Sequence, residues 1–140
     1  MSKYTYEPYF FEDGSISSEY WHKDGKLHRE GDKPAYISYR KDGSIERELW
    51  FKNGKRYREG DKPALILYRK AGSIRLERWF KDRKYHREGG KPAEVWYRED
   101  GSIEEEHWFK DGIEYIPQTD SCHDKVVEID GKKYKLTLVD

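Results

Sequence analysis

The sequence has few of the residues that usually build a protein core, and it has no long apolar stretch. Leu, Ile, Val and Phe together make up 25 of the 140 residues, about 18%, and a share under roughly 20% raises the question of disorder. No run of about 18 apolar residues occurs, which excludes a membrane-spanning helix. The first residues lack the apolar segment of a signal peptide, so we expect a cytoplasmic protein, in the host cytoplasm if a phage encodes it.

Cysteine and net charge are scarce as well. The single cysteine excludes an internal disulfide framework and is typical of a reducing compartment. Lys plus Arg and Asp plus Glu each number 28, so the formal net charge is zero. A neutral chain lacks the basic character expected of a nucleic-acid-binding protein. It also lacks the high net charge that accompanies most disordered chains, so a folded domain is expected.

Aromatic rings supply the apolar area that the aliphatic residues do not. The chain has 12 Tyr, 5 Trp and 5 Phe among residues of which 40% are charged. Each ring can bury roughly 150–250 Å². The composition therefore predicts a folded but thin structure, in which rings and the long stems of Lys and Arg cover one another.

A repeat with a period of 29 residues organises the chain between residues 12 and 116. The first invariant group consists of tryptophans at Trp21, Trp50, Trp79 and Trp108. A second consists of glutamates two residues earlier, at Glu19, Glu48, Glu77 and Glu106. Gly-Ser-Ile and Pro-Ala segments keep the same interval. Self-similarity of this kind is the sequence signature of a repeat architecture.

Each unit is expected to contain two antiparallel strands. Asp-Gly and Asn-Gly dipeptides, which favour hairpin turns, separate short runs rich in Tyr, Trp, Phe and Ile. Gly or Pro recurs at short intervals through most of the repeats, which disfavours helices. We therefore predict an all-β, elongated antiparallel β-meander built from four 29-residue hairpin repeats, with a C-terminal capping hairpin. The predicted parts are an N-terminal cap strand (1–11), four tandem repeats (12–116), a loop (117–125) and the C-terminal hairpin (126–140).

The segments G-S-I-x-x-E-x-W-F-K-x-G-K and H-R-E-G-D-K-P-A resemble MORN-type and related W-x-x-N-G-K-x-H-R repeats. These short β-hairpin repeats occur in bacterial proteins, some of them antitoxin-like, and in phages and large DNA viruses. The resemblance implies a binding or scaffold role without enzymatic activity. The unit here is longer than the common MORN unit and carries R-E-G-D-K-P-A in place of Gly-rich spacing, which argues against membrane binding.

Two groups of residues could suggest a metal or catalytic site, and we expect neither to be one. His28 and His86 lie two repeats apart, roughly 20 Å by strand spacing, which is too far to share a zinc ion. Cys122, His123 and Asp124 are adjacent, and side chains of adjacent extended residues point in opposite directions. We therefore predict no catalytic residue, no metal and no cofactor.

The repeated glutamates and tryptophans are expected to be structural. Four identical carboxylates at regular steps indicate a cross-strand charge ladder with the lysines that follow. Trp50 with Arg47 and Lys52 could stack on bases and hold phosphates. The glutamate next to each tryptophan repels a nucleic-acid backbone, so packing of cations on rings within the sheet is the favoured interpretation.

Positions where the units differ are not needed for the contacts that recur within the sheet. These positions supply the candidate partner-binding residues. The differing positions include Glu94, Ser38 and Leu49, and the candidates chosen from this set are Tyr36, Leu65, Leu67, Arg78, Trp96 and His107. Leu65, Leu67 and Trp96 are expected to share a face, where they would form an apolar patch unless the C-terminal hairpin covers it.

The expected function is a non-enzymatic protein-binding repeat module. By the resemblance, it would act as a phage or bacterial inhibitor or antitoxin-like protein that occludes a toxin or a defence or effector protein. The alternative is a nucleic-acid-binding or DNA-mimicking protein that uses a charged sheet face. A homodimer through a sheet edge or face is a further option.

Overall fold

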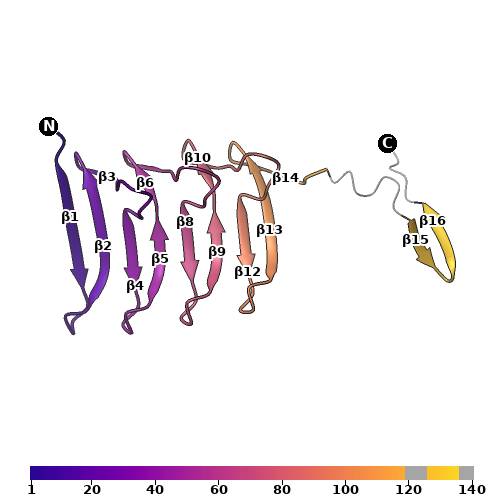
Figure 1. The fold of residues 1–140 in the computed structure, drawn as a ribbon, viewed down its shortest axis with the longest axis horizontal. Helices are drawn as coiled ribbons and strands as arrows, with labels where there is room; N and C mark the ends of the chain where they lie inside the picture. Colours follow the sequence, from indigo (N-terminus) through magenta and orange to yellow (C-terminus); the bar gives the residue numbers. More distant parts are fainter. Residues whose placement is uncertain (119–125, 136–140) are drawn as a thin grey trace.

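The computed structural model describes residues 1–118 and 126–135, and these form an all-β protein with one large antiparallel sheet (Figure 1). The strands of the large sheet are β1 (Tyr4–Phe10), β2 (Ile16–Lys23), β3 (Lys26–Leu27), β4 (Tyr36–Tyr39), β5 (Ile45–Leu49), β8 (Leu65–Tyr68), β9 (Ile74–Arg78), β12 (Glu94–Tyr97), β13 (Ile103–Lys110) and β14 (Ile113–Tyr115). Separate small hairpins are β6 (Phe51–Lys52) with β7 (Lys55–Arg56), β10 (Phe80–Lys81) with β11 (Lys84–Tyr85), and β15 (Val126–Ile129) with β16 (Lys132–Lys135).

The large sheet follows the chain in order, β1-β2-β4-β5-β8-β9-β12-β13-β14, with β3 paired to β2. Neighbouring strands are antiparallel throughout. The predicted all-β antiparallel meander is therefore confirmed. Among the described residues, no helix is long and apolar enough to cross a bilayer.

One kind of turn joins the long strands at the lower end of the sheet in Figure 1. The amide of Arg40 donates to the carbonyl of Ser44 (2.9 Å), and the Asp42 carboxylate accepts from both the amide and the hydroxyl of Ser44. Gly43 has a φ of 85°, a region that glycine enters without steric cost. The same backbone bond recurs at Arg69 and Arg98, so local sequence explains this end of the sheet.

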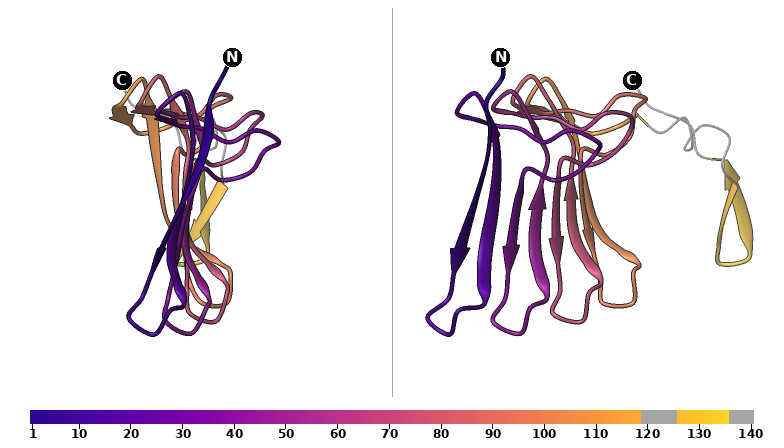
Figure 2. Two further views of the ribbon diagram at one scale, coloured as in Figure 1. Left: turned by 90° about the vertical axis from the view of Figure 1, so that its left-hand side faces the viewer. Right: turned by 60° about the vertical axis from the view of Figure 1, so that its left-hand side comes forward.

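The other end is built from the loops that precede each Pro-Ala segment. The edge-on view in Figure 2 shows a thin sheet from which these loops project. The amide of Trp50 donates to the carbonyl of Ala64 (2.9 Å), which places the loop residues 58–63 beside the tryptophan. We call the face that carries Trp50 and Ile66 the loop face, and the opposite face, which carries Leu49 and Leu65, the outer face.

The core is divided between the two faces of this single layer. On the outer face Leu49, Leu65 and Leu76 form one buried cluster. Two clusters on the loop face are Trp50 with Ala64 and Ile66, and Trp79 with Ala93 and Val95. Side chains of the same face bury one another across the strands, which is how a sheet without a second layer excludes water.

The predicted ends of the chain are described in part. The N-terminal cap strand is present as β1, paired to β2 along its length. A C-terminal hairpin is present as β15 and β16, which pair with each other through Val126↔Lys135 to Ile129↔Lys132. Its capping role stays a prediction. Most of the predicted loop, including Cys122, His123 and Asp124, lies outside the described residues.

Candidate protein-binding face

Three of the four repeated tryptophans are covered by arginines eight residues further along the chain. The guanidinium carbon lies 3.6 Å from the ring centroid for Arg29 on Trp21, and 3.8 Å for Arg58 on Trp50. Arg87 covers Trp79 in the same way. Packing of cations on rings within the sheet was predicted, but the predicted partners of Trp50 were wrong. Arg47 lies on the other face, because the residues at 47 and 50 are an odd number of positions apart in an extended strand.

Two of these arginines, Arg58 and Arg87, also join neighbouring units through an acidic residue of the preceding loop. Arg58 donates to both carboxylate oxygens of Asp32, which also accepts from Lys62 at 2.8 Å. Arg58 also donates to the carbonyl of Pro63. Bidentate pairing of this kind holds a guanidinium in one orientation. Asp61 binds Arg87 and Lys91 equivalently.

We call the two ion-paired groups, Asp32 with Arg58 and Lys62 and Asp61 with Arg87 and Lys91, the clamps. The pKa values of their aspartates make the clamps sensitive to acid. Hydrogen bonds from Arg58 and Lys62 lower the pKa of Asp32 to about 2, and those from Arg87 and Lys91 lower the pKa of Asp61 further. A lowered pKa contributes stability that is complete above the ordinary value of 3.8 and is lost as the pH falls toward the folded value. We therefore expect the free energy of unfolding to fall between about pH 4 and pH 2.

The check is urea unfolding at a series of acidic pH values for the wild type and for the double variant Asp32→Asn, Asp61→Asn. The variant should be less stable at neutral pH and should lose less stability on acidification. Asp82→Asn, at an exposed turn outside the clamps, is the matched control. Equal acid dependence of the wild type and the double variant would contradict the role of the clamps.

Three of the four repeated glutamates accept hydrogen bonds from tyrosines on the loop face. The Tyr68 hydroxyl donates to Glu48 at 2.6 Å, and Tyr97 donates to Glu77 at the same distance. Glu19 accepts from both Tyr6 and Tyr39. The predicted pairing of these glutamates with lysines is therefore wrong. Tyr39, Tyr68 and Tyr97 each lie twenty residues after their glutamate, in a strand of the next unit, whereas Tyr6 lies in the preceding strand.

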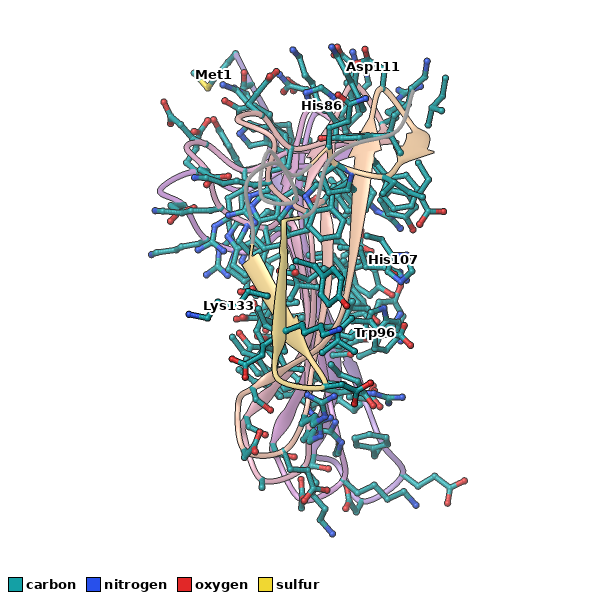
Figure 3. The ribbon with its side chains drawn as sticks, turned by 90° about the vertical axis from the view of Figure 1, so that its right-hand side faces the viewer. Met1, His86, Trp96, His107, Asp111 and Lys133 are labelled. Carbon is teal, nitrogen blue, oxygen red and sulfur yellow. The ribbon has the colours of Figure 1, made fainter. Side chains whose placement is uncertain are left out.

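The histidines at equivalent positions have a structural role. The Nδ1 atom of His28 accepts the amide of Asn53 at 3.0 Å, and His86 accepts the amide of Asp111 at the same distance. Figure 3 shows His86 beside Asp111 at the loop end of the sheet. Within residues 1–118 and 126–135, no group of three or more His, Cys, Asp or Glu side chains is arranged to hold a metal ion.

The six predicted partner-binding residues all lie on the outer face. The strand register aligns them in two rows that run across the sheet. One row is Tyr20, Tyr36, Leu49, Leu65, Arg78, Glu94 and His107. The other is Ser18, Ser38, Arg47, Leu67, Leu76, Trp96 and Glu105. Figure 3, viewed along the rows, shows Trp96 and His107 on the same side of the sheet.

Trp96 is held in place by its neighbours. Its indole Nε1 donates to Glu94 at 2.8 Å, and the other oxygen of that carboxylate accepts from Arg78. The guanidiniums of Arg75 and Arg78 lie 5.8 and 6.0 Å from the ring centroid. The ring is half-buried and packs against the cluster of Leu49, Leu65 and Leu76. A large ring fixed in one orientation and still partly exposed is typical of a binding anchor.

The sequence prediction missed part of this face. Leu76 was not named, and Leu49 was named as a differing position but not as a binding candidate, although both are buried in one cluster with Leu65. The sequence signal for both leucines is that their positions vary between units. Leu76 is equivalent to Arg47, and Leu49 is equivalent to Arg78. Arg47 and Arg75 are exposed and make no ion pair within the described part of the chain.

Charge is unevenly distributed over the outer face. Arg47 and Arg75 flank the leucines at its centre, whereas Glu105 follows Trp96 at the end near β13. His107 lies between Glu105 and Glu114, and its hydrogen bond to Glu114 raises the pKa of its imidazole. The face therefore presents a central apolar strip with a basic flank and a more acidic end.

Comparisons of the chain with protein-family profiles, with curated proteins and with solved structures give no match. The resemblance to MORN-type repeats accordingly stays a prediction. The outer face is an ordered apolar strip on a single-layer sheet, and it is built from the positions at which the units differ.

Proposed function

We propose that this protein is a non-enzymatic protein-binding module that holds its partner on the outer face. One observation carries the proposal: residues shared by most of the units build the loop face and the clamps, whereas residues that differ between units line the outer face. The invariant Trp, Arg, Glu and Tyr side chains are used in contacts within the sheet. The differing residues are not required for those contacts, so their apolar character points to a partner.

Steric occlusion is the proposed mode of action. A rigid sheet whose apolar strip covers a partner's surface blocks access to it without chemistry, and Trp96 with Leu67 would be the central contacts. In line with the resemblance, the proposed partner is a toxin or a defence or effector protein, bound in the cytoplasm. The basic flank at Arg47 and Arg75 favours a partner with carboxylates beside its apolar surface.

The test is affinity capture from the source cells with four baits: wild type, Trp96→Ala, Leu67→Asp and Ile103→Asp. Ile103 is 49% exposed and lies on the loop face, so its variant is a matched control for a new charge. We expect one partner with the wild type and the control, bound about tenfold or more weakly by the other two. Equal capture by Leu67→Asp, or no saturable partner of the wild type, would contradict the proposal.

The nucleic-acid alternative receives less support from the contacts. The rings of Trp21, Trp50 and Trp79, which would stack on bases, are already covered by arginines of the same sheet. Those arginines are in turn engaged by carbonyls, and two of them by aspartates. A mobility-shift assay at low salt checks this alternative, and binding at micromolar protein would revive it.

A further inference from the structure

Part of β13 forms an unpaired edge of the large sheet. In the other units the equivalent residues pair with the first strand of the next unit. In the interior, β5 pairs with β8 through Arg47↔Leu67, Glu48↔Ile66 and Leu49↔Leu65. The strands β2 and β9 have the same kind of neighbour. At the equivalent residues 105–107, β13 is paired with β12 alone, because β14 contacts β13 only at residues 108–110.

The backbone of Glu106 points out of this edge. Trp50 and Ala64 are joined by a backbone hydrogen bond, and alternation along an antiparallel ladder then directs the N–H and C=O of Glu48 toward β8. Glu106 occupies the equivalent position in β13. Its backbone groups are therefore available to another strand, and an unpaired edge of this kind is a template for strand addition.

The side chains at the edge are acidic and incompletely paired. Glu104 and Glu105 are exposed, and Glu106 follows them directly. The equivalents Glu48 and Glu77 accept a tyrosine hydroxyl from the next unit. No tyrosine within the described residues donates to Glu106. A strand that carries positive charge would satisfy this edge, since opposite charges facing across a ladder are stabilising.

The strand β16 has this composition and a free edge of its own. It pairs with β15 on one side only, and Lys132, Lys133 and Tyr134 are exposed. Ile129 and Lys132 flank a two-residue turn whose φ values are 52° and 74°, so they are a hydrogen-bonded pair. By alternation, the N–H and C=O of Lys133 point away from β15.

We propose that β16 adds to β13 as the final strand of the large sheet, antiparallel, with Lys133 opposite Glu106. This register is the one in which the outward backbone groups of both strands meet. It places Tyr134 opposite Glu105 on the outer face and Lys133 against Glu106 on the loop face. The eight residues between Pro117 and Val126 span up to about 26–29 Å, which is enough to return the hairpin to the neighbouring edge. The strand β15 does not fit this edge, because its outward Glu128 would face Glu106.

Cysteine pairs in the full chain test the register, in a Cys122→Ser background. The pair Glu105→Cys with Tyr134→Cys is expected to form an intrachain disulfide under mild oxidation, since facing residues of a ladder meet the distance requirement. The control pair, Glu105→Cys with Lys133→Cys, places the second thiol on the opposite face and should form at least tenfold less. Equal yields, no disulfide, or a disulfide between two copies would overturn the proposal.

Hydrogen exchange provides a measurement that does not depend on cysteine chemistry. The amide of Glu106 is expected to exchange about tenfold or more slowly in the full chain than in Lys133→Glu, in which like charges face each other across the edge. The amide of Glu48, inside the sheet, serves as the internal reference and should be unchanged. Fast exchange of the Glu106 amide in the wild type would overturn the proposal. Neither result depends on the partner of the outer face.

Discussion

Replacement of Leu76 by alanine is expected to lower the free energy of unfolding by about 2–5 kcal/mol. Leu76 is 1% exposed and is the largest fully buried side chain in the described residues. It lies in β9 with Leu67 on one side and Trp96 on the other. Truncation leaves a void that a flat sheet closes poorly. Since small domains are stable by only about 5–15 kcal/mol, this single change removes a large part of the total.

Urea unfolding followed by circular dichroism measures this loss, and Leu67→Ala is the matched control. Leu67 has the same side chain on the same face, but it is half-buried. Its variant should therefore lose clearly less stability than Leu76→Ala, because less apolar area leaves water on folding. A control as damaging as Leu76→Ala would show that the outer-face cluster is not centred on Leu76.

Replacement of Tyr68 by phenylalanine is expected to cost about 1.5–3 kcal/mol, the usual contribution of a hydrogen bond to a charged group. Tyr68 donates to Glu48 at 2.6 Å, and the variant leaves this half-buried carboxylate without that donor. Tyr57→Phe is the control, because Tyr57 is exposed and its ring contact with Lys52 does not need the hydroxyl. A Tyr68→Phe variant as stable as the control would contradict the structural role of the Glu–Tyr pairs.

The same tyrosines make the fold sensitive to alkali. Burial, and then the hydrogen bond to Glu48, raise the pKa of Tyr68 well above its ordinary value of 10.0, and Tyr39 and Tyr97 are raised for the same reasons. A raised pKa contributes stability that is complete below pH 10 and is lost as the pH rises toward the folded value. The decline in unfolding free energy above about pH 10 should therefore be shallower in Tyr68→Phe than in the wild type.

Much of the architecture could be predicted because its causes are local. Turn dipeptides such as Asp42-Gly43 determine where strands reverse, and the lower turn is closed by a hydrogen bond within five residues. Alternation along a strand is equally local, so the prediction that Leu65, Leu67 and Trp96 share a face was correct. Both features follow from backbone geometry and do not need the positions of distant residues.

The partners of the invariant side chains could not be predicted in the same way. Glu48 is near Lys52 in sequence, yet it binds Tyr68 from the next strand. Trp50 is near Arg47, yet Arg58 covers it, returning from the loop on the same face. These contacts depend on the register between strands, and a shift by one residue would move every side chain to the opposite face.

The sequence alone thus determined that this protein is an antiparallel meander and that Leu65, Leu67 and Trp96 share a face, because turn chemistry and a period of two act within a few residues. Only the tertiary structure decided which leucines of the outer face are buried. Leu76 lies between Leu67 and Trp96, and this neighbourhood exists only once β8, β9 and β12 are aligned. The same alignment of strands brings Asp32 to Arg58 and Asp61 to Arg87. At β13 no further strand pairs with residues 105–107 among the described residues, so that edge is free.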